Sequence, residues 1–201
     1  MTAVPASYDM SGGSYPISLD VDGPQKQQML SVLLRIIFAI PAFIFTAVLG
    51  IVVGVVTLIA WVVILITGKY PAGMIKLAEG YLRVSARTNG YLYLLTDKMP
   101  PFSLEEDSSY PVRLAIQGQI EGRNRLTVLF RIFAALPHLI ILGALGYVME
   151  VVGFVAWIIA LVKGELPEGL HNFIAGYVRW YSRAGGYVLL LTDEYPPFSL
   201  S

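Results

Sequence analysis

The chain of 201 residues contains no cysteine, and only 14% of its residues are charged, whereas 56% are hydrophobic. The absence of cysteine excludes disulfides, thiolate catalysis and cysteine metal sites. Soluble domains usually carry about 25% charged residues, so the shortage of charge indicates a membrane protein. The formal net charge is zero, which provides no field that would favour nucleic acid as a partner.

The hydrophobic residues are concentrated in two blocks, at about 29–67 and 126–162. One straight helix over the first block would be about 58 Å long, nearly twice the roughly 30 Å of a bilayer core. Each block therefore predicts a transmembrane helical hairpin, with its turn near 46–54 or 143–150. The sequence as a whole predicts four transmembrane helices.

Basic residues support this arrangement. All 14 Lys and Arg lie outside 36–68 and 132–162. With two hairpins they would all lie on one side of the membrane, which the positive-inside rule identifies as cytoplasmic. We therefore expect a multi-pass protein with both termini in the cytoplasm.

The sequence repeats itself at an offset of 96 residues, which indicates a tandem duplication. The repeat predicts a first unit at 15–104, a linker at 105–109 and a second unit at 110–200. Residues 1–14 are small, polar or acidic, and we expect a disordered tail. The matches include Arg35 with Arg131, Pro41 with Pro137, Trp61 with Trp157, Gly80-Tyr81 with Gly176-Tyr177, and Thr96-Asp97 with Thr192-Asp193.

Each unit shows the same succession of patterns around its hairpin. It opens with a short alternating segment, at 17–21 and 112–116, which predicts a β-strand. An amphipathic helix follows the hairpin, over about 74–87 in the first unit; we expect it to lie in the membrane interface, with packing on the protein's own strands as the alternative. Turns at Asn89-Gly90 and Gly185-Gly186 then lead to predicted strands at 91–95 and 187–191, each pairing with the opening strand of its own unit.

The two units end almost identically, in Pro-Pro-Phe-Ser-Leu after Thr-Asp. With the Gly-Tyr-x-Arg and Gly-x-x-Pro motifs before it, this ending resembles the bacterial and archaeal membrane family labelled domain of unknown function 4389, which is often duplicated. The resemblance covers nearly the whole chain. It implies a protein of a bacterial or archaeal inner membrane, and it supplies no activity, substrate or catalytic residue.

Charged residues that recur in both units are the candidate functional residues. Arg35 and Arg131 each lie near the start of an apolar block, where an arginine either snorkels to the surface or contacts a lipid headgroup. Asp97 and Asp193 recur without a recurring His, Ser or Cys at a suitable spacing. We therefore expect them to stabilise a turn or to pair with Arg83, Arg87, Arg179 or Arg183. The candidate contacts to lipid headgroups or to a partner are Arg35, Arg131, Arg83, Arg179, Arg87 and Arg183.

The only histidines, His138 and His171, have no counterpart in the first unit, where Ala42 and Ile75 stand. A haem or pigment ligand at His138 is conceivable, but a structural histidine is the preferred interpretation. The sequence identifies no catalytic residue and no metal ligand, and we expect no cofactor.

These observations predict a non-catalytic accessory or scaffold protein of a larger membrane complex, with membrane lipids and other membrane subunits as its partners. The alternative is a protein that binds or transports a lipid, a quinone or another apolar molecule between the two hairpins. An enzyme ranks third.

Overall fold

The computed structural model describes residues 15–201, so the expected tail at 1–14 lies outside the described residues. The described chain is mostly helical, with one small antiparallel sheet. Its elements, in order, are β1 (Ile17–Val21), α1 (Met29–Leu33), α2 (Arg35–Thr67), α3 (Ala72–Leu92), β2 (Val112–Ile116), α4 (Arg125–Leu129), α5 (Arg131–Lys163) and α6 (Glu168–Val188).

The two apolar blocks form single long helices. Helices α2 and α5 each run unbroken for 33 residues, about 50 Å. The expected turns at 46–54 and 143–150 do not form, so the prediction of four transmembrane helices is wrong: the described chain has two helices long and apolar enough to cross a membrane. The physical reason lies in these segments, which contain no Pro, Asn or Asp that would end a helix, and an isolated glycine does not stop one.

Helices α3 and α6 run back along the long helices and extend beyond the predicted amphipathic segments. Asn89-Gly90 and Gly185-Gly186 lie inside them, so the turns predicted there are wrong. The strands predicted at 91–95 and 187–191 are also absent, because these residues complete the helix and then turn sharply. Leu94 and Leu190 make that turn, each with a φ of 65°.

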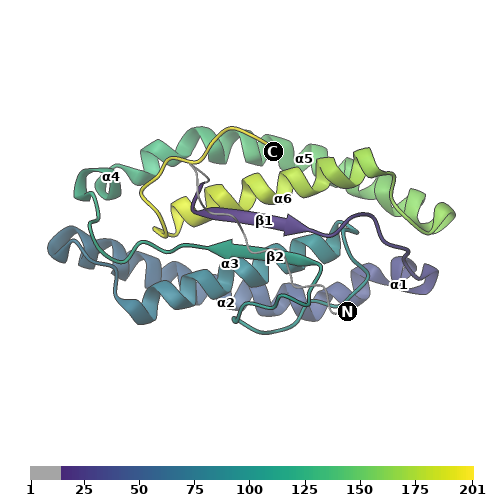
Figure 1. The fold of residues 1–201 in the computed structure, drawn as a ribbon, viewed down its shortest axis with the longest axis horizontal. Coiled ribbons are helices and arrows are strands. Elements are labelled where there is room, and N and C mark those ends of the chain that lie inside the picture. Colours follow the sequence, from purple (N-terminus) through teal and green to yellow (C-terminus); the bar gives the residue numbers. More distant parts are fainter. Residues whose placement is uncertain (1–14) are drawn as a thin grey trace, which may run out of the picture.

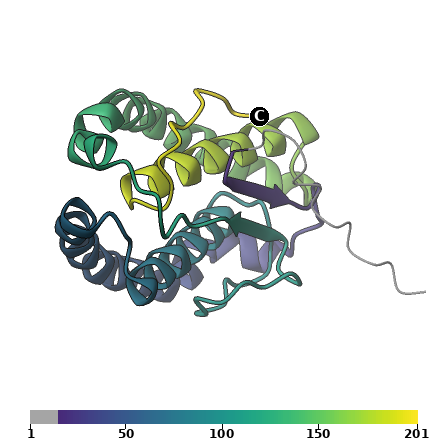
Figure 2. The same cartoon turned by 60° about the vertical axis from the view of Figure 1, so that its left-hand side comes forward.

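The elements form three layers. The sheet packs on α3 and α6, with β2 against α3 and β1 against α6, and each of these helices also contacts the long helix of its own unit. In Figure 1 the strands lie near the middle of the long axis, and Figure 2 shows them on the side of α3 and α6 away from the long helices. Helices α3 and α6 are therefore internal, and the prediction that they lie in the membrane interface is replaced by the alternative of packing on the protein's own strands.

The sheet joins the two units. Strands β1 and β2 pair antiparallel, with Leu19 opposite Leu114 at the centre. The opening strands were predicted correctly, including the buried face to which Ile17 and Val112 belong. The predicted pairing within each unit was wrong, because the second strand of each unit does not exist and the two opening strands satisfy each other's backbone.

Two tryptophans also cross between the units. The indole nitrogen of Trp61 on α2 donates to the carbonyl of Val128 in α4 at 2.9 Å, and that of Trp157 on α5 donates to the carbonyl of Val32 in α1 at 2.8 Å. Each long helix is thereby fixed to the short helix of the other unit. The recurrence of this tryptophan in both copies has a structural cause.

Glycine 90 allows the sheet to approach the helices. A Cβ on Gly90 would lie 2.8 Å from the Cγ2 atom of Val112, a fully buried strand residue. Valine is stiff at χ1 and has no room to turn away. The helical position of Gly90, which suggested a turn in the sequence, is thus explained by close packing against β2.

We expect Gly90→Ala to lower the midpoint of thermal unfolding, because overpacking a tight interface costs about 1–3 kcal/mol and outweighs the gain in helix propensity. Gly73→Ala is the matched control on the same helix, since no atom lies within 4 Å of its new Cβ, and it should not lower the midpoint. The double variant Gly90→Ala with Val112→Ala should recover part of the loss. Equal midpoints for Gly90→Ala and Gly73→Ala would contradict this account.

Candidate functional site

The first residue of α2, Arg35, is the centre of a buried polar cluster. Its Nη1 donates to the carbonyls of Tyr91 and Thr96, both at 2.7 Å, and its Nη2 donates to Gln27 at 2.8 Å and to Asp97 at 2.9 Å. The guanidinium also lies over the Tyr91 ring, 4.5 Å from its centroid. We call Arg35, Gln27, Tyr91, Thr96 and Asp97 the Arg35 cluster.

The second unit builds the same arrangement around Arg131, the first residue of α5. Its Nη1 donates to the carbonyls of Tyr187 and Thr192, its Nη2 pairs with Asp193, and its guanidinium lies over the Tyr187 ring. The position of Gln27 is taken by a second arginine, Arg123, which lies 3.0 Å from Asp193. We call Arg131, Arg123, Tyr187, Thr192 and Asp193 the Arg131 cluster.

Both clusters hold the strained turn that follows the internal helix. Gln27 donates to the carbonyl of Leu94, and Arg123 donates to that of Leu190. A leucine in the left-handed region is unfavourable, and such a conformation persists only where its surroundings impose it. Burial lowers the pKa of Arg123 to about 10, so it stays cationic at neutral pH beside the carboxylate of Asp193.

The aspartates also anchor the start of each unit's short helix. The second carboxylate oxygen of Asp97 accepts from the backbone N–H of Gln28 at 3.1 Å, and that of Asp193 accepts from the N–H of Asn124 at 2.8 Å. Both residues directly precede a short helix, so the carboxylates satisfy N–H groups that a helix start leaves free. The expectation that the aspartates serve structure agrees with this geometry, although their partners are Arg35 and Arg131 rather than the arginines of the internal helices.

The predicted snorkelling of Arg35 and Arg131 is wrong, because each is only 2% exposed. Their donors point inward to carbonyls and carboxylates. The physical reason is that carbonyls at the ends of α3 and α6, and in the turns that follow, face the start of each long helix and accept further hydrogen bonds there. A planar guanidinium with five N–H donors satisfies several acceptors at once.

The four arginines of the internal helices also serve the fold. Arg87 donates to the carbonyls of Ser103 and Glu105, and Arg179 donates to those of Leu19 and Leu200. Arg183 donates to the carbonyl of Ser201, and Arg83 lies 3.9 Å from Glu79. Three of these arginines thus hold backbone of the segments that end the two units.

Both histidines, His138 and His171, are buried. Nδ1 of His138 accepts from the indole nitrogen of Trp180 at 3.0 Å, and its ring stacks on Phe198 with centroids 3.9 Å apart. His138 is 1% exposed and His171 is 2% exposed. The aromatic neighbours of His138 occupy the space beside its ring, which is the packing of a structural histidine. Within residues 15–201 no group of three or more His, Asp and Glu side chains is placed to hold a metal ion.

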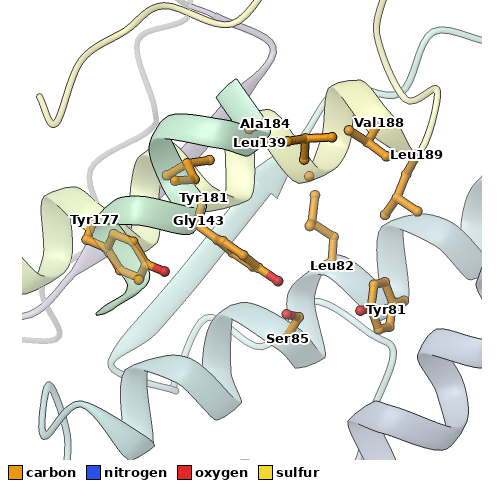
Figure 3. A pocket seen from close by; sticks show the side chains of 13 residues that line it. Tyr81, Leu82, Ser85, Leu139, Gly143, Tyr177, Tyr181, Ala184, Val188 and Leu189 are labelled. Carbon is orange, nitrogen blue, oxygen red and sulfur yellow. The ribbon is translucent and has the colours of Figure 1, made fainter. Parts of the chain in front are cut away.

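A groove lies on the side of α3 and α6 away from the sheet, bordered by α5. Its cavity measures about 460 Å³, within the range of small-molecule sites. Figure 3 shows the rings of Tyr81, Tyr177 and Tyr181 and the hydroxyl of Ser85 gathered around one space, with apolar side chains beside them. The groove combines an apolar lining with a few hydroxyl groups from both units.

Several residues of these sites did not stand out in the sequence. Tyr91 and Tyr187 recur at the offset of 96 residues, as do Tyr81 and Tyr177, so the duplication carried a signal for them. Gln27 and Arg123 also lie 96 residues apart, but the residue type differs between the units, so the repeat did not mark them as a matching pair. The groove joins three helices of two units, and no local pattern indicates it.

The comparisons with known proteins agree with the duplication. The family model described as Domain of unknown function (DUF4389) matches the chain twice, at residues 29–103 and 125–199. No curated protein and no solved structure matches the chain.

We expect Arg35→Met to lower protein stability by about 3–5 kcal/mol, because it removes a buried cation that donates to the partly buried carboxylate of Asp97 and to two carbonyls. Lys69→Met is the control: Lys69 pairs with Glu121 in full exposure, and its loss should leave the unfolding midpoint nearly unchanged. The measurement is thermal unfolding in mild detergent. The double variant Arg35→Met with Asp97→Leu should be more stable than Arg35→Met alone; an equal or lower midpoint would refute the role of the buried pair.

Proposed function

The chain belongs to the family described as Domain of unknown function (DUF4389), and since that description assigns no activity, we propose its function from its geometry. We propose a non-catalytic membrane protein that serves as an accessory or scaffold subunit, with membrane lipids and other membrane proteins as its partners. The observation that carries the proposal is the apolar surface of α2 and α5.

Both long helices pack against the protein along one narrow stripe only. In the most apolar part of each helix, 17% of the residues are buried, so neither is the core helix of a soluble protein. The remaining circumference exposes large apolar side chains, which water does not favour and a bilayer does. On α2 these include Ile40, Phe43, Ile51, Val55, Leu58 and Val62.

The recurring polar residues favour a structural role over chemistry. In both units the recurring Arg, Asp and Tyr hold helix ends, and the guanidinium groups donate to backbone carbonyls. A catalytic group would need an accessible position beside a reactant. In a subunit that binds partners through an apolar surface, the buried polar groups serve to hold the fold together, as they do in this chain.

The location follows from the same proposal. We place the protein in the inner membrane of a bacterium or archaeon, with both termini on the cytoplasmic side, because the basic residues all lie outside the apolar parts of α2 and α5.

The test is gentle purification from native membranes, with identification of what co-migrates. We expect the protein to stay with the membrane after an alkaline carbonate wash and to co-migrate with defined membrane proteins. Ile51→Arg, on the exposed face of α2, should weaken membrane retention, whereas Ile51→Leu should not. A lone monomer in every mild detergent would contradict the scaffold role.

A second candidate function is the binding of a lipid, a quinone or another apolar molecule, and the groove between the units favours it. Its cavity of about 460 Å³ is lined mostly by apolar atoms and includes the hydroxyls of Tyr81 and Tyr177. Such a mixture suits an elongated apolar molecule with one polar end.

For this candidate we expect native mass spectrometry to detect a retained apolar molecule that is lost in Gly143→Phe. Gly143 lines the groove, and no atom lies within 4 Å of a Cβ added there. The variant should therefore fold, with the new phenyl ring filling the groove. Ile140→Phe is the control, because Ile140 is exposed on the same helix outside the groove. Retention of the same molecule by Gly143→Phe would exclude the groove as its site.

A further inference from the structure

We propose that α2 and α5 do not cross the membrane but lie parallel to its plane, both embedded in a single leaflet, with the sheet facing the aqueous phase. The partner of the exposed face of these two helices is thus one leaflet of a lipid bilayer. This inference rests on the proposed membrane location and specifies how the protein sits there.

The position of the sheet carries the argument. The strands lie near the middle of the long axis of the molecule (Figure 1), on the side opposite the long helices (Figure 2). If α2 and α5 stood along the membrane normal, a two-stranded sheet with open edges would lie at the centre of the bilayer. Hydrocarbon does not tolerate unpaired backbone at an open sheet edge.

The charged residues on the sheet support the same orientation. Arg113 pairs with Asp20 and Asp22, whose side chains are 49% and 42% exposed. If α2 and α5 stood along the membrane normal, these carboxylates would face lipid near the bilayer centre, where a charge is very unfavourable. With the helices in the membrane plane, the same residues face water.

Glu150 supplies an independent constraint. It is exposed and lies three residues past the midpoint of α5, so an upright α5 would hold it within about 5 Å of the bilayer centre. In a helix that lies in the plane, every position has nearly the same depth. Glu150 lines a hollow beside Tyr93 and Arg35, and from that side of the helix it reaches the polar interface.

The dimensions fit a single leaflet. Each long helix is about 50 Å long, well beyond a hydrocarbon core of roughly 30 Å, but a helix is only about 10 Å thick. One layer of two such helices therefore fits within the roughly 15 Å of one leaflet. The layers behind them, α3 with α6 and then the sheet, extend toward the headgroups and water.

The one-sided distribution of Lys and Arg also follows. Hairpins were expected because they would bring all basic residues to one side, but helices lying in the plane achieve this without any crossing. Lys26 and Lys69 mark the two ends of α2, and Arg125 and Lys163 mark the two ends of α5. All four ends then lie on the same side of the membrane.

The first test uses the absence of cysteine in the sequence. Lys26→Cys and Lys69→Cys are exposed positions before and after α2, to be treated with a membrane-impermeant maleimide in intact cells and in sealed inverted vesicles. We expect both to be modified in one preparation and both to be protected in the other. If one cysteine is modified only in intact cells and the other only in inverted vesicles, α2 crosses the membrane and the proposal is overturned.

The second test measures depth directly. Spin labels at Ile44→Cys, Ile51→Cys and Leu58→Cys lie seven residues apart along the exposed side of α2, and Asp20→Cys on the sheet provides the aqueous reference. Collisions with oxygen and with a water-soluble nickel chelate should place the three labels at one common depth. A crossing helix would instead place Ile51 deepest, with successive labels differing by up to about 10 Å.

The remaining outcomes separate this proposal from the proposed function. If neither oxygen nor the nickel chelate collides with the three labels, another protein covers α2. That result would overturn the leaflet proposal and leave the scaffold role intact. Three labels fully accessible to nickel would mean that α2 is outside the membrane, and both proposals would fail.

Discussion

The fold depends on placing one guanidinium at the start of each long helix. There Arg35 and Arg131 donate to backbone carbonyls at the ends of α3 and α6 and in the turns that follow, and they pair with the carboxylate of Asp97 or Asp193. A buried carbonyl without a donor is costly, and a buried arginine without acceptors is costlier, so each satisfies the other. This pairing fixes the entry to the long helix, the exit from the internal helix and the strained leucine turn between them.

Because the charges are turned inward, the long helices can present an almost purely apolar exterior. The sheet and its ion pairs occupy the opposite side of the molecule, so polar and apolar surfaces are separated across the three layers rather than along the helices. That separation runs perpendicular to the long axes of α2 and α5.

The periodic features were predictable from the sequence, and those that depend on long-range geometry were not. The alternation at 17–21 and 112–116 identified both strands, and the amphipathic pattern identified α3 and α6. The hairpins were wrong because they were inferred from block length and bilayer thickness, although the segments expected to turn contain no Pro, Asn or Asp that would end a helix. Arg35 was misassigned because an arginine flanking an apolar run looks the same in sequence whether its donors meet water or the carbonyls of a helix 56 residues away.

The cross-unit contacts have an evolutionary consequence. Trp61 and Trp157 each bind the short helix of the other copy, and β1 has no partner within its own copy. A polypeptide with a single copy would therefore leave a strand edge and an indole unpaired, and two such polypeptides would complete each other as a symmetric homodimer. The tandem chain has the form of that dimer after gene fusion, with the linker at 105–109 joining the subunits and each half free to diverge, as Gln27 and Arg123 have done.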